Sequence, residues 1–318
     1  MAVPMGPRTT SSGQKIEVRN LTKRYGTTLA VDDLSFNVNP GFVTGFIGPN
    51  GSGKTTTMKL ILGLDNPTSG QVTVGGKPYR DLPAPLREVG ALIDAKAVHP
   101  SRTAYHYLLG LAQSNAIPTS RIDEVLGLVG MEAVAGKRVG GFSLGMGQRL
   151  GIAGALLGDP PVLMFDEPLN GLDPEGIVWI RQLMQHLAGE GRTVFVSSHL
   201  MNEMAVTADH LIVIGQGKLL RDEGVNEFVD SNSEHWVLVR SPELDELSAE
   251  LTKAGARVKP GTEESIEVTG LDAQSIGDLA AAKGLTLHEL ATQRASLEDA
   301  FMDLTRDSVQ YRAAKAAA

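Results

Sequence analysis

The stretch GPNGSGKTT, Gly48–Thr56, decides the fold, because it matches G-x-x-x-x-G-K-[ST] at every fixed position. A short apolar run, Phe42–Ile47, reads as a buried strand before it, and the segment after it has the apolar spacing of a helix. In that setting the glycines let successive backbone N–H groups point at phosphate oxygens, and the helix adds its positive N-terminal end. We interpret the stretch as a phosphate-binding loop rather than a flexible loop that fits the pattern by chance.

The loop supplies most of the predicted nucleotide contacts. Lys54 can reach the β- and γ-phosphates, and the hydroxyl of Thr55 suits Mg²⁺. The residues expected to contact the nucleotide here are Gly48, Pro49, Asn50, Gly51, Ser52, Gly53, Lys54, Thr55 and Thr56.

Two carboxylates follow a second buried run, VLMFDEP. Asp166 and Glu167 end this strand where a parallel sheet places its ligands, at the carboxyl edge. Alone, such a pair is more often a helix cap or a solvated turn. Beside a phosphate-binding loop, we expect Asp166 to hold the Mg²⁺ shell through water and Glu167 to polarise a water molecule for in-line attack.

Two aromatic or imidazole side chains are further candidates. His199 follows the strand-like run TVFVSS on the same edge and is predicted to contact the γ-phosphate or to position water. Tyr25 could stack on a base or simply pack. The remaining histidines are interpreted as structural: His99, His106, His186, His210, His235 and His288.

Composition narrows the classes of protein. The 318 residues suffice for two domains, and 42% hydrophobic and 21% charged residues are globular values. A net charge of −8 argues against a nucleic-acid binder that uses a large basic face. The chain has no cysteine, which excludes disulfides, zinc–thiolate sites and cysteine nucleophiles. No apolar run approaches the roughly 18–20 residues of a membrane helix.

Periodicity predicts the organisation of the chain. Residues 1–14 read as a loose tail, and residues 15–224 read as an α/β domain that begins with antiparallel strands. Its core sheet is mostly parallel, and a helical subdomain is inserted at about 95–158. Residues 225–318 show the order strand, helix, strand, strand, helix, strand, which suggests a small ferredoxin-like α+β domain, followed by an amphipathic helix.

Four motifs together resemble one family. GPNGSGKTT, SLGMGQR (Ser143–Arg149), LMFDEPLNGLD (Leu163–Asp173) and VSSH each occur once, in the order and spacing of an ATP-binding cassette (ABC) ATPase, and the resemblance covers about 15–222. It implies a P-loop NTPase fold, Mg²⁺-dependent hydrolysis of ATP, and a homodimer that sandwiches two ATP molecules. Tyr25 would stack on adenine and Asp173 would lie beside the dimer interface.

SLGMGQR resembles the family's signature motif, which completes the ATP site of a second copy of the chain. Ser143 and Gly145 would contact the γ-phosphate, in agreement with their place at a helix N-terminus; the alternative is a simple N-cap by Ser143. Leu144 and Met146 depart from the common LSGGQ sequence. Asp94 stands where the family usually has glutamine, and its carboxylate can still meet Mg²⁺ or a water bound to it.

Within the family, the chain is most similar to the ATP-binding subunits of drug and antibiotic exporters of the daunorubicin- and bacitracin-resistance types. The variant signature, Asp94, the C-terminal domain and the ending SLEDAFMDLT (Ser296–Thr305) are shared traits. This resemblance implies separate membrane-spanning subunits and a cytoplasmic position at the inner face of the membrane, with no nucleic acid as partner. Val98, Tyr105 and Tyr107 are candidate contacts with those subunits, or core residues of the helical lobe.

Three alternatives stay open at this point. An importer ATPase would share all the cassette motifs. A non-transport ABC ATPase commonly has two cassettes or a long coiled-coil insertion, and this sequence has neither. A regulatory module would bind ATP without turnover, which Glu167 and His199 argue against.

Overall fold

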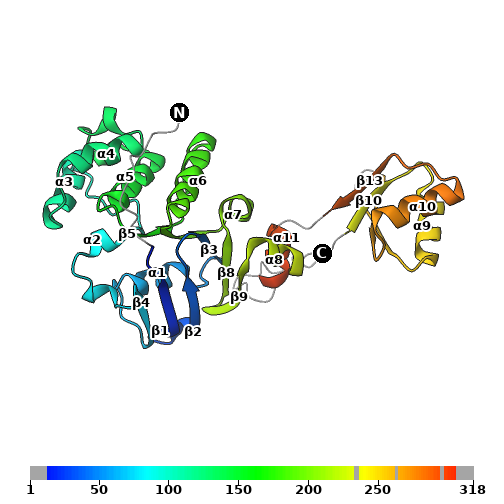
Figure 1. Cartoon of the computed structure of the whole chain (residues 1–318), viewed down its shortest axis with the longest axis horizontal. Coiled ribbons are helices and arrows are strands. Elements are labelled where there is room, and N and C mark those ends of the chain that lie inside the picture. Colours follow the sequence, from blue (N-terminus) through cyan, green and yellow to red (C-terminus); the bar gives the residue numbers. More distant parts are fainter. Residues whose placement is uncertain (1–12, 233–235, 262–263, 294–296, 306–318) are drawn as a thin grey trace, which may run out of the picture. The chain divides into compact units, whose positions relative to one another are not determined.

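The computed structural model describes residues 13–232, 236–261, 264–293 and 297–305. The chain divides into two compact units, the first reaching Val225 and the second running from Asn226 to Leu304. Each unit is described by itself below (Figure 1). Residues 1–12 of the predicted tail, and His235 and Ser296, lie outside the described residues.

A three-stranded antiparallel sheet opens the first unit. Its order is β2 (Thr28–Val38), β1 (Ile16–Tyr25), β4 (Ser69–Val74). Alternate residues are buried, such as Ile16, Val18, Phe36 and Val38, because one face packs on the core and the other meets solvent. The antiparallel strands expected from the period of two are therefore confirmed.

A six-stranded sheet carries the predicted site. Its order is β5 (Val89–Leu92), β6 (Val162–Asp166), β7 (Thr193–Ser198), β3 (Val43–Ile47), β8 (His210–Gly215), β9 (Lys218–Gly224). The first five strands are parallel, and β9 returns antiparallel to β8. Every residue of β3, β6 and β7 is buried, which is why these strands read as continuous apolar runs.

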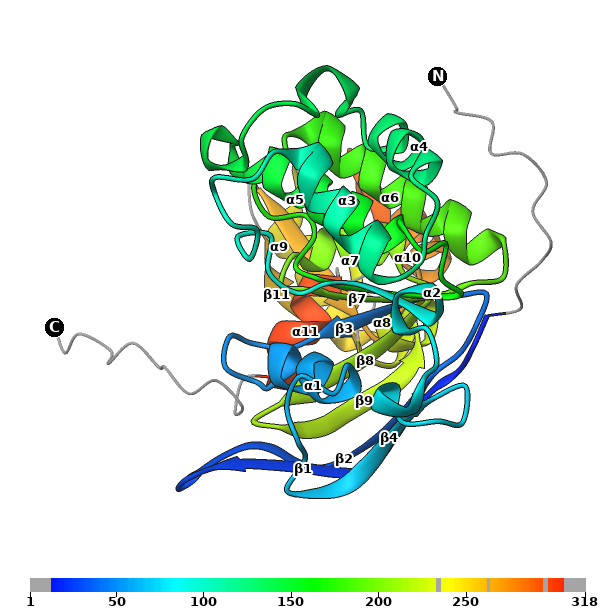
Figure 2. The ribbon, with the colours of Figure 1, turned by 90° about the vertical axis from the view of Figure 1, so that its left-hand side faces the viewer.

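Helices cover both faces of this sheet. Helix α1 (Lys54–Ile61) lies between the two sheets, and α3–α6 lie on the opposite side of the six-stranded sheet (Figure 2). The helices predicted by the 3.6-residue period are present. The remaining helices of this unit are η1 (Tyr79–Asp81), α2 (Pro85–Glu88), α3 (Ala104–Ser114), α4 (Ser120–Leu128), η2 (Glu132–Val134), η3 (Val139–Gly141), α5 (Leu144–Leu156), α6 (Pro174–Gly189) and α7 (Met201–Thr207).

The main core fills the space between the two sheets. Phe36, Phe46 and Phe195 meet there with ring centroids 5.1–5.9 Å apart. All three side chains are buried, and each fully buried side chain of this size contributes about 1.5–3 kcal/mol of transfer free energy. This packing holds β3, and with it the loop that follows β3.

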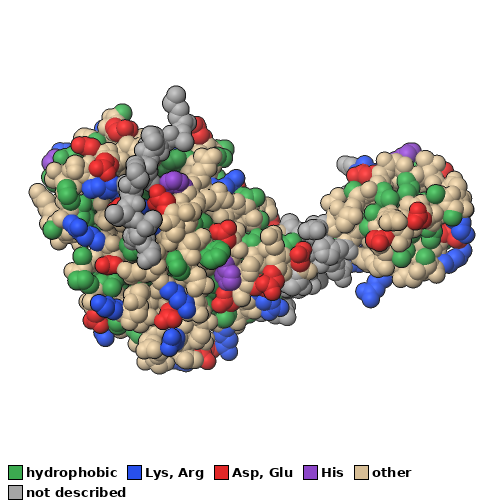
Figure 3. All heavy atoms as spheres, in the orientation of Figure 1, with side chains coloured by type: hydrophobic (Ala, Val, Ile, Leu, Met, Phe, Trp, Pro, Cys, Tyr) green, Lys and Arg blue, Asp and Glu red, His purple; other side chains and the backbone are tan. Residues whose placement is uncertain are grey.

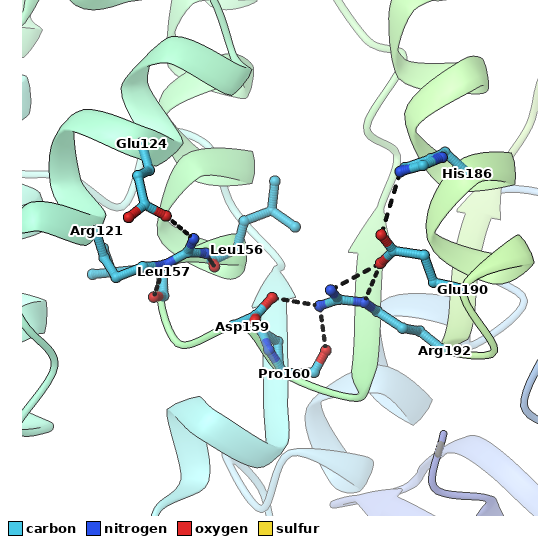
Figure 4. Close-up of polar contacts among 9 residues, drawn as sticks. All are labelled: Arg121, Glu124, Leu156, Leu157, Asp159, Pro160, His186, Glu190 and Arg192. Carbon is cyan, nitrogen blue, oxygen red and sulfur yellow. Dashed lines mark hydrogen bonds and ion pairs between the residues drawn. The ribbon is translucent and has the colours of Figure 1, made fainter. Parts of the chain in front are cut away.

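Arg192 links the segments that precede strands β6 and β7 through hydrogen bonds (Figure 4). Its guanidinium donates to Asp159 Oδ1 at 2.8 Å, to Pro160 O at 3.1 Å and to Glu190 Oε2 at 2.9 Å. Because only 8% of the side chain is exposed, these three acceptors compensate the cost of burying its charge. The segments before β6 and β7 are thereby held together.

The second unit is a four-stranded antiparallel sheet with helices α9 (Leu244–Lys253) and α10 (Ala273–Lys283). The strand order is β11 (Arg257–Pro260), β12 (Ser265–Thr269), β10 (Trp236–Arg240), β13 (Glu289–Gln293). This is the ferredoxin-like arrangement that the alternation of elements predicted. Helices α8 (Val225–Asn232) and α11 (Leu297–Thr305) flank these elements in the sequence.

Acidic and basic side chains are interspersed over the described part of the face drawn in Figure 3. Every helix within the described ranges is too short or too polar to cross a bilayer.

Candidate functional site

The phosphate-binding loop joins β3 to α1 at the carboxyl edge of the parallel strands. Gly53 has a φ of 104°, and a Cβ there would lie 2.5 Å from Ala30 O. A Cβ at Gly48 would lie 2.4 Å from Ile214 O. Both positions therefore need glycine, one for its conformation and both for close approach. Helix α1 has no side-chain N-cap and no acidic residue in its first turn, so its N-terminal N–H groups are left for an anion.

Lys54 lies inside this loop. Its Nζ donates to Gly48 O at 2.6 Å and to Pro49 O at 3.3 Å. Burial lowers the pKa of the Lys54 ammonium, while Glu167 and Asp166 act in the opposite direction through their charge. The cation is thus placed where phosphate oxygens could replace the carbonyl oxygens as acceptors.

Asp166 and Thr55 come together as predicted. Thr55 Oγ1 donates to Asp166 Oδ2 at 2.7 Å, and Ser197 Oγ donates to Asp166 Oδ1. Hard oxygen donors of this kind fit Mg²⁺, which usually takes one or two carboxylates and completes its shell with water and phosphate oxygens. Among the described residues, no group of three or more His, Cys, Asp or Glu side chains could hold a metal ion.

Glu167 faces His199 across the same edge. Glu167 Oε2 lies 2.7 Å from His199 Nδ1 and also accepts from His199 N at 3.4 Å. The Glu167 backbone has a φ of 50°, a left-handed conformation that costs a non-glycine residue about 1–2 kcal/mol. Its N–H is held by Ser197 through O at 3.2 Å and Oγ at 3.0 Å. Neighbouring strands therefore fix the carboxylate beside the imidazole.

The signature segment begins helix α5. Ser143 Oγ accepts from Met146 N at 3.2 Å. Ser143 therefore caps the helix, as the alternative interpretation of this serine predicted. A serine hydroxyl that accepts one N–H still has its own O–H to donate, and the cap leaves the γ-phosphate role open. A Cβ at Gly145 would lie 2.7 Å from Gly171 O. The signature segment therefore packs on the loop after Glu167 in the same chain.

Asp173 caps a helix and Asp94 accepts a hydrogen bond within its own loop. Asp173 is the N-cap of α6, and its Oδ1 accepts from Gly176 N at 2.9 Å. Asp94 Oδ1 accepts from Lys96 N at 2.8 Å. Within the described part of the chain, no hydrogen bond joins Asp94 to Thr55 or Asp166, so the predicted Mg²⁺ contact of Asp94 stays a prediction.

Tyr25 is held by two charged neighbours. It is 46% exposed, its hydroxyl donates to Asp65, and Lys23 Nζ lies 4.6 Å from its ring centroid. The hydrogen bond to Asp65 raises the pKa of the Tyr25 phenol. Lys23 also forms an ion pair with Asp65 at 2.6 Å. The ring is accessible and held in place, as base stacking requires.

One of the three candidate partner contacts lies at a groove of about 310 Å³, and neither Tyr105 nor Tyr107 lines this groove. Val98 lines it, whereas the Tyr107 hydroxyl lies 3.2 Å from the position of a Cβ at Gly154 in α5. Burial raises the pKa of the Tyr107 phenol. Tyr107 is thus packed within the helical lobe, and Val98 is the better candidate. The residues that line the groove are Ala95, Lys96, Val98, Pro100, Val139, Phe142, Ser143, Leu144 and Gly147.

Two residues of the site lie within the motifs VSSH and SLGMGQR but were not predicted as site residues. Ser197 contacts both Asp166 and Glu167, and Gln148 Nε2 donates to Glu167 O at 3.2 Å. A signal for Ser197 was present, since a small hydroxyl residue ends a buried apolar strand just before His199. Gln148 lies within SLGMGQR, but the motif does not show that its amide contacts the backbone of Glu167.

Comparisons with known proteins identify the family. A family model described as "ABC transporter" matches residues 31–170, and one described as "Domain of unknown function (DUF8746)" matches residues 235–298. The bacitracin transport ATP-binding protein BcrA of Bacillus licheniformis is 44% identical over 215 residues, 65% of this chain and 69% of that protein. The uncharacterized ABC transporter ATP-binding protein YhcH of Bacillus subtilis is 34% identical over 303 residues, 93% and 98% of the two chains.

The solved structures agree with the sequence relatives. A dimeric post-hydrolysis state of the ATP-binding cassette MJ0796, bound to ADP and Pi, superposes with a TM-score of 0.60 at 28% identity, covering 66% of this chain and 98% of that one. The predicted α/β P-loop NTPase fold is confirmed by this likeness. The sequence relatives, the solved structures and the residues gathered at the carboxyl edge of the sheet agree. The chain belongs to the ABC transporter family, as an ATP-binding subunit with ATPase activity.

Proposed function

We propose that this ATPase subunit powers an exporter of an antibiotic or another hydrophobic compound. The observation that carries the proposal is the 44% identity with a protein named for bacitracin transport, together with the variant signature and Asp94. In this proposal residues 15–224 form the ATP-binding module and residues 225–318 an accessory domain. Separate membrane-spanning subunits hold the chain at the cytoplasmic face of the membrane.

ATP is bound by the loop after β3. Backbone N–H groups of Gly48–Thr56 and the α1 N-terminus receive the phosphates, and Lys54 exchanges its contacts with Gly48 O and Pro49 O for phosphate oxygens. Tyr25 presents its ring to the adenine. When bound, Mg²⁺ neutralises the charge that develops on the β- and γ-phosphate oxygens. Thr55 and Asp166 are the residues that would hold it.

Glu167 is the proposed general base. Its carboxylate takes a proton from water as the water oxygen bonds to the γ-phosphorus, and the bond from that phosphorus to the β–γ bridging oxygen breaks, giving ADP and phosphate. His199 lies 2.7 Å from the carboxylate. It orients the base and can reach toward the γ-phosphate. Lys54 lies close enough to stabilise the negative charge on the leaving side.

The site of one chain is completed by a second copy. Ser143 and Gly145 of the partner subunit contact the γ-phosphate in this proposal, and Asp173 lies beside the interface. The support is the exposed position of Ser143 at the start of α5 and the dimeric state of the MJ0796 cassette. ATP binding closes the dimer, and hydrolysis opens it again.

The groove beside Val98 is the proposed contact with the membrane subunits. It lies between the 95–100 loop and the start of α5, so a partner seated there touches the signature segment directly. Closure of the dimer would then be transmitted to the membrane subunits through this groove.

Two substitutions test the ATPase cycle. Lys54→Ala is expected to lower steady-state phosphate release by at least about 100-fold, since the lost cation faces the transferred phosphoryl group. Glu167→Gln is expected to bind MgATP and form a dimer that size-exclusion chromatography with light scattering detects, because binding remains while hydrolysis stops. Undiminished hydrolysis by Lys54→Ala, or a Glu167→Gln chain that stays monomeric with MgATP, contradicts the proposed site or the proposed sandwich.

Transport direction needs a cellular assay. The chain and its membrane subunits, expressed in a bacitracin-sensitive host, are expected to raise the minimal inhibitory concentration several-fold, and Lys54→Ala is the control that abolishes the effect. ATP-dependent accumulation of a solute delivered by a binding protein would instead support the importer alternative.

A further inference from the structure

Helix α5 contains a buried amide whose role the proposed cycle does not use. Gln148 is 5% exposed, and its Nε2 donates to Glu167 O at 3.2 Å. Its Oε1 has no hydrogen-bond partner within the described part of the chain. Because the atom it faces is a carbonyl oxygen, only the amide nitrogen can make this contact, which fixes the orientation of the amide.

The unpartnered oxygen argues against a purely structural role. A buried polar atom without a partner destabilises the fold, and an apolar side chain of equal length avoids that cost. The carbonyl of Glu167 keeps a second donor in any case, Asn170 N at 3.3 Å. Folding alone therefore does not call for glutamine here, and the remaining distinctive property of Gln148 is its contact with Glu167.

The hydrogen bond from Gln148 is made to the backbone of Glu167, which has an unusual conformation. Glu167 has a φ of 50°, and its N–H is held from β7 by Ser197. Gln148 holds the opposite end of the same residue from α5. The direction of the Glu167 carboxylate thus depends on where α5 lies relative to β7.

The same helix begins at the other functional segment. Ser143 caps α5, and Gln148 lies five residues later, about 7.5 Å along a rigid helix. Gly145 packs on Gly171 O, so the first turn of α5 also touches the loop that follows Glu167. A displacement of the first turn is carried to Glu167 without a flexible segment between them.

We propose that Gln148 is a positioning residue that couples the two ATP sites of the dimer. This inference rests on the proposed function, in which Ser143 of each chain contacts the ATP bound by the other chain. When the α5 N-terminus seats on that nucleotide, the Gln148 amide sets Glu167 for the nucleotide in its own site. Hydrolysis at one site therefore requires that the other site be occupied.

Gln148→Met tests the coupling, because methionine keeps the length of the side chain and removes the donor. Gln185→Met is the matched control: Gln185 also donates to a backbone carbonyl, Val206 O at 3.1 Å, but from the exposed face of α6. We expect Gln148→Met to lower kcat about tenfold, with the Kd of a fluorescent ATP analogue and the Tm unchanged. Gln185→Met is expected to leave all three unchanged. A wild-type kcat for Gln148→Met would overturn the proposal.

A double-mutant cycle with Ser143→Ala separates coupling from a general loss of activity. If Ser143 acts on Glu167 in part through Gln148, the double variant is expected to lose less activity than the product of the two single losses. Single losses that multiply in full would overturn the coupling. The activity of each variant is compared with that of active wild-type protein. If the ATPase assignment were wrong, the wild-type protein itself would not hydrolyse ATP, so that outcome is distinct from failure of the coupling.

The pH dependence of the activity of Gln148→Glu is a second test, which can be used if Gln148→Met does not fold. An ionised carboxylate cannot donate to Glu167 O, whereas the protonated acid can, and burial raises the pKa of a carboxyl group. The activity of Gln148→Glu relative to wild type is therefore expected to rise as the pH is lowered. A ratio that is independent of pH would contradict a role for the donated hydrogen bond.

Discussion

Ser197 gives the sharpest test of how the two carboxylates are held. Its hydroxyl is fully buried, donates to Asp166 Oδ1 and accepts from Glu167 N at 3.0 Å. Ser197→Ala removes both bonds. A hydrogen bond to a charged group contributes about 1.5–3 kcal/mol. The bond to Glu167 N is partly duplicated by Ser197 O at 3.2 Å, so the total loss should be about 2 kcal/mol.

That loss is measurable in two ways. For a unit of this size, about 2 kcal/mol corresponds to a Tm lower by about 4–8 °C, which differential scanning calorimetry detects. An Asp166 carboxylate that loses one of its two holding groups can shift by about 1 Å, and such a displacement lowers kcat by up to about 100-fold. We therefore expect kcat to fall about 10- to 100-fold in a phosphate-release assay at saturating MgATP.

Ser198→Ala is the matched control. Ser198 is the next residue of β7 and is equally buried, but its hydroxyl accepts from Leu200 N at 2.9 Å. Loss of this neutral bond should cost about 1 kcal/mol with kcat almost unchanged. Equal losses of kcat in the two variants would refute the reasoning, because they would show that the carboxylates do not depend on Ser197.

Two further predictions concern the loop and the second unit. Gly53→Ala should weaken ATP binding by at least about tenfold in calorimetry, since its φ of 104° and the 2.5 Å approach to Ala30 O force the loop to move. Gly41 has a φ of 82° but no atom within 4 Å of an added Cβ, so Gly41→Ala should lower stability and leave the Kd for ATP unchanged. Equal Kd values for the Gly53→Ala and Gly41→Ala variants would contradict the steric argument. Hydrogen bonds from Lys253 and then Lys283 lower the pKa of Glu250 to about 2, so their stabilisation is complete above the ordinary pKa of 4.5 and is lost as the pH falls toward 2. In a carbon NMR titration, Lys253→Ala should raise the Glu250 pKa, and an unchanged pKa would contradict the pairing.

The parts of the site that the sequence predicts are those encoded within one segment. The strand–loop–helix around Lys54, and the positions of Asp166 and His199 at strand ends, follow from short patterns that fix local conformation. Ser197 and Gln148 could not be assigned in this way. Their roles depend on β7 lying directly between β6 and β3 and on α5 packing against the strand that carries Glu167.

The fold shows the same contrast. Period-two and period-3.6 patterns predict the strands and helices of both units. The order of the six-stranded sheet is set by packing between distant segments, so no local pattern contains it. The contact between Gly145 and Gly171 O is likewise invisible in sequence, because two loops far apart in the chain create it.

The central position of β3 also has a consequence for the chain during its synthesis. Both strands that pair with β3 are made late, since β7 begins at Thr193, roughly 150 residues after Ile47. At about 5–20 residues per second, the P-loop segment has been synthesised roughly 7–30 s before either neighbouring strand. During that interval the apolar strand β3 has neither of the strands that bury it in the folded unit, and an unpaired apolar strand is prone to aggregate.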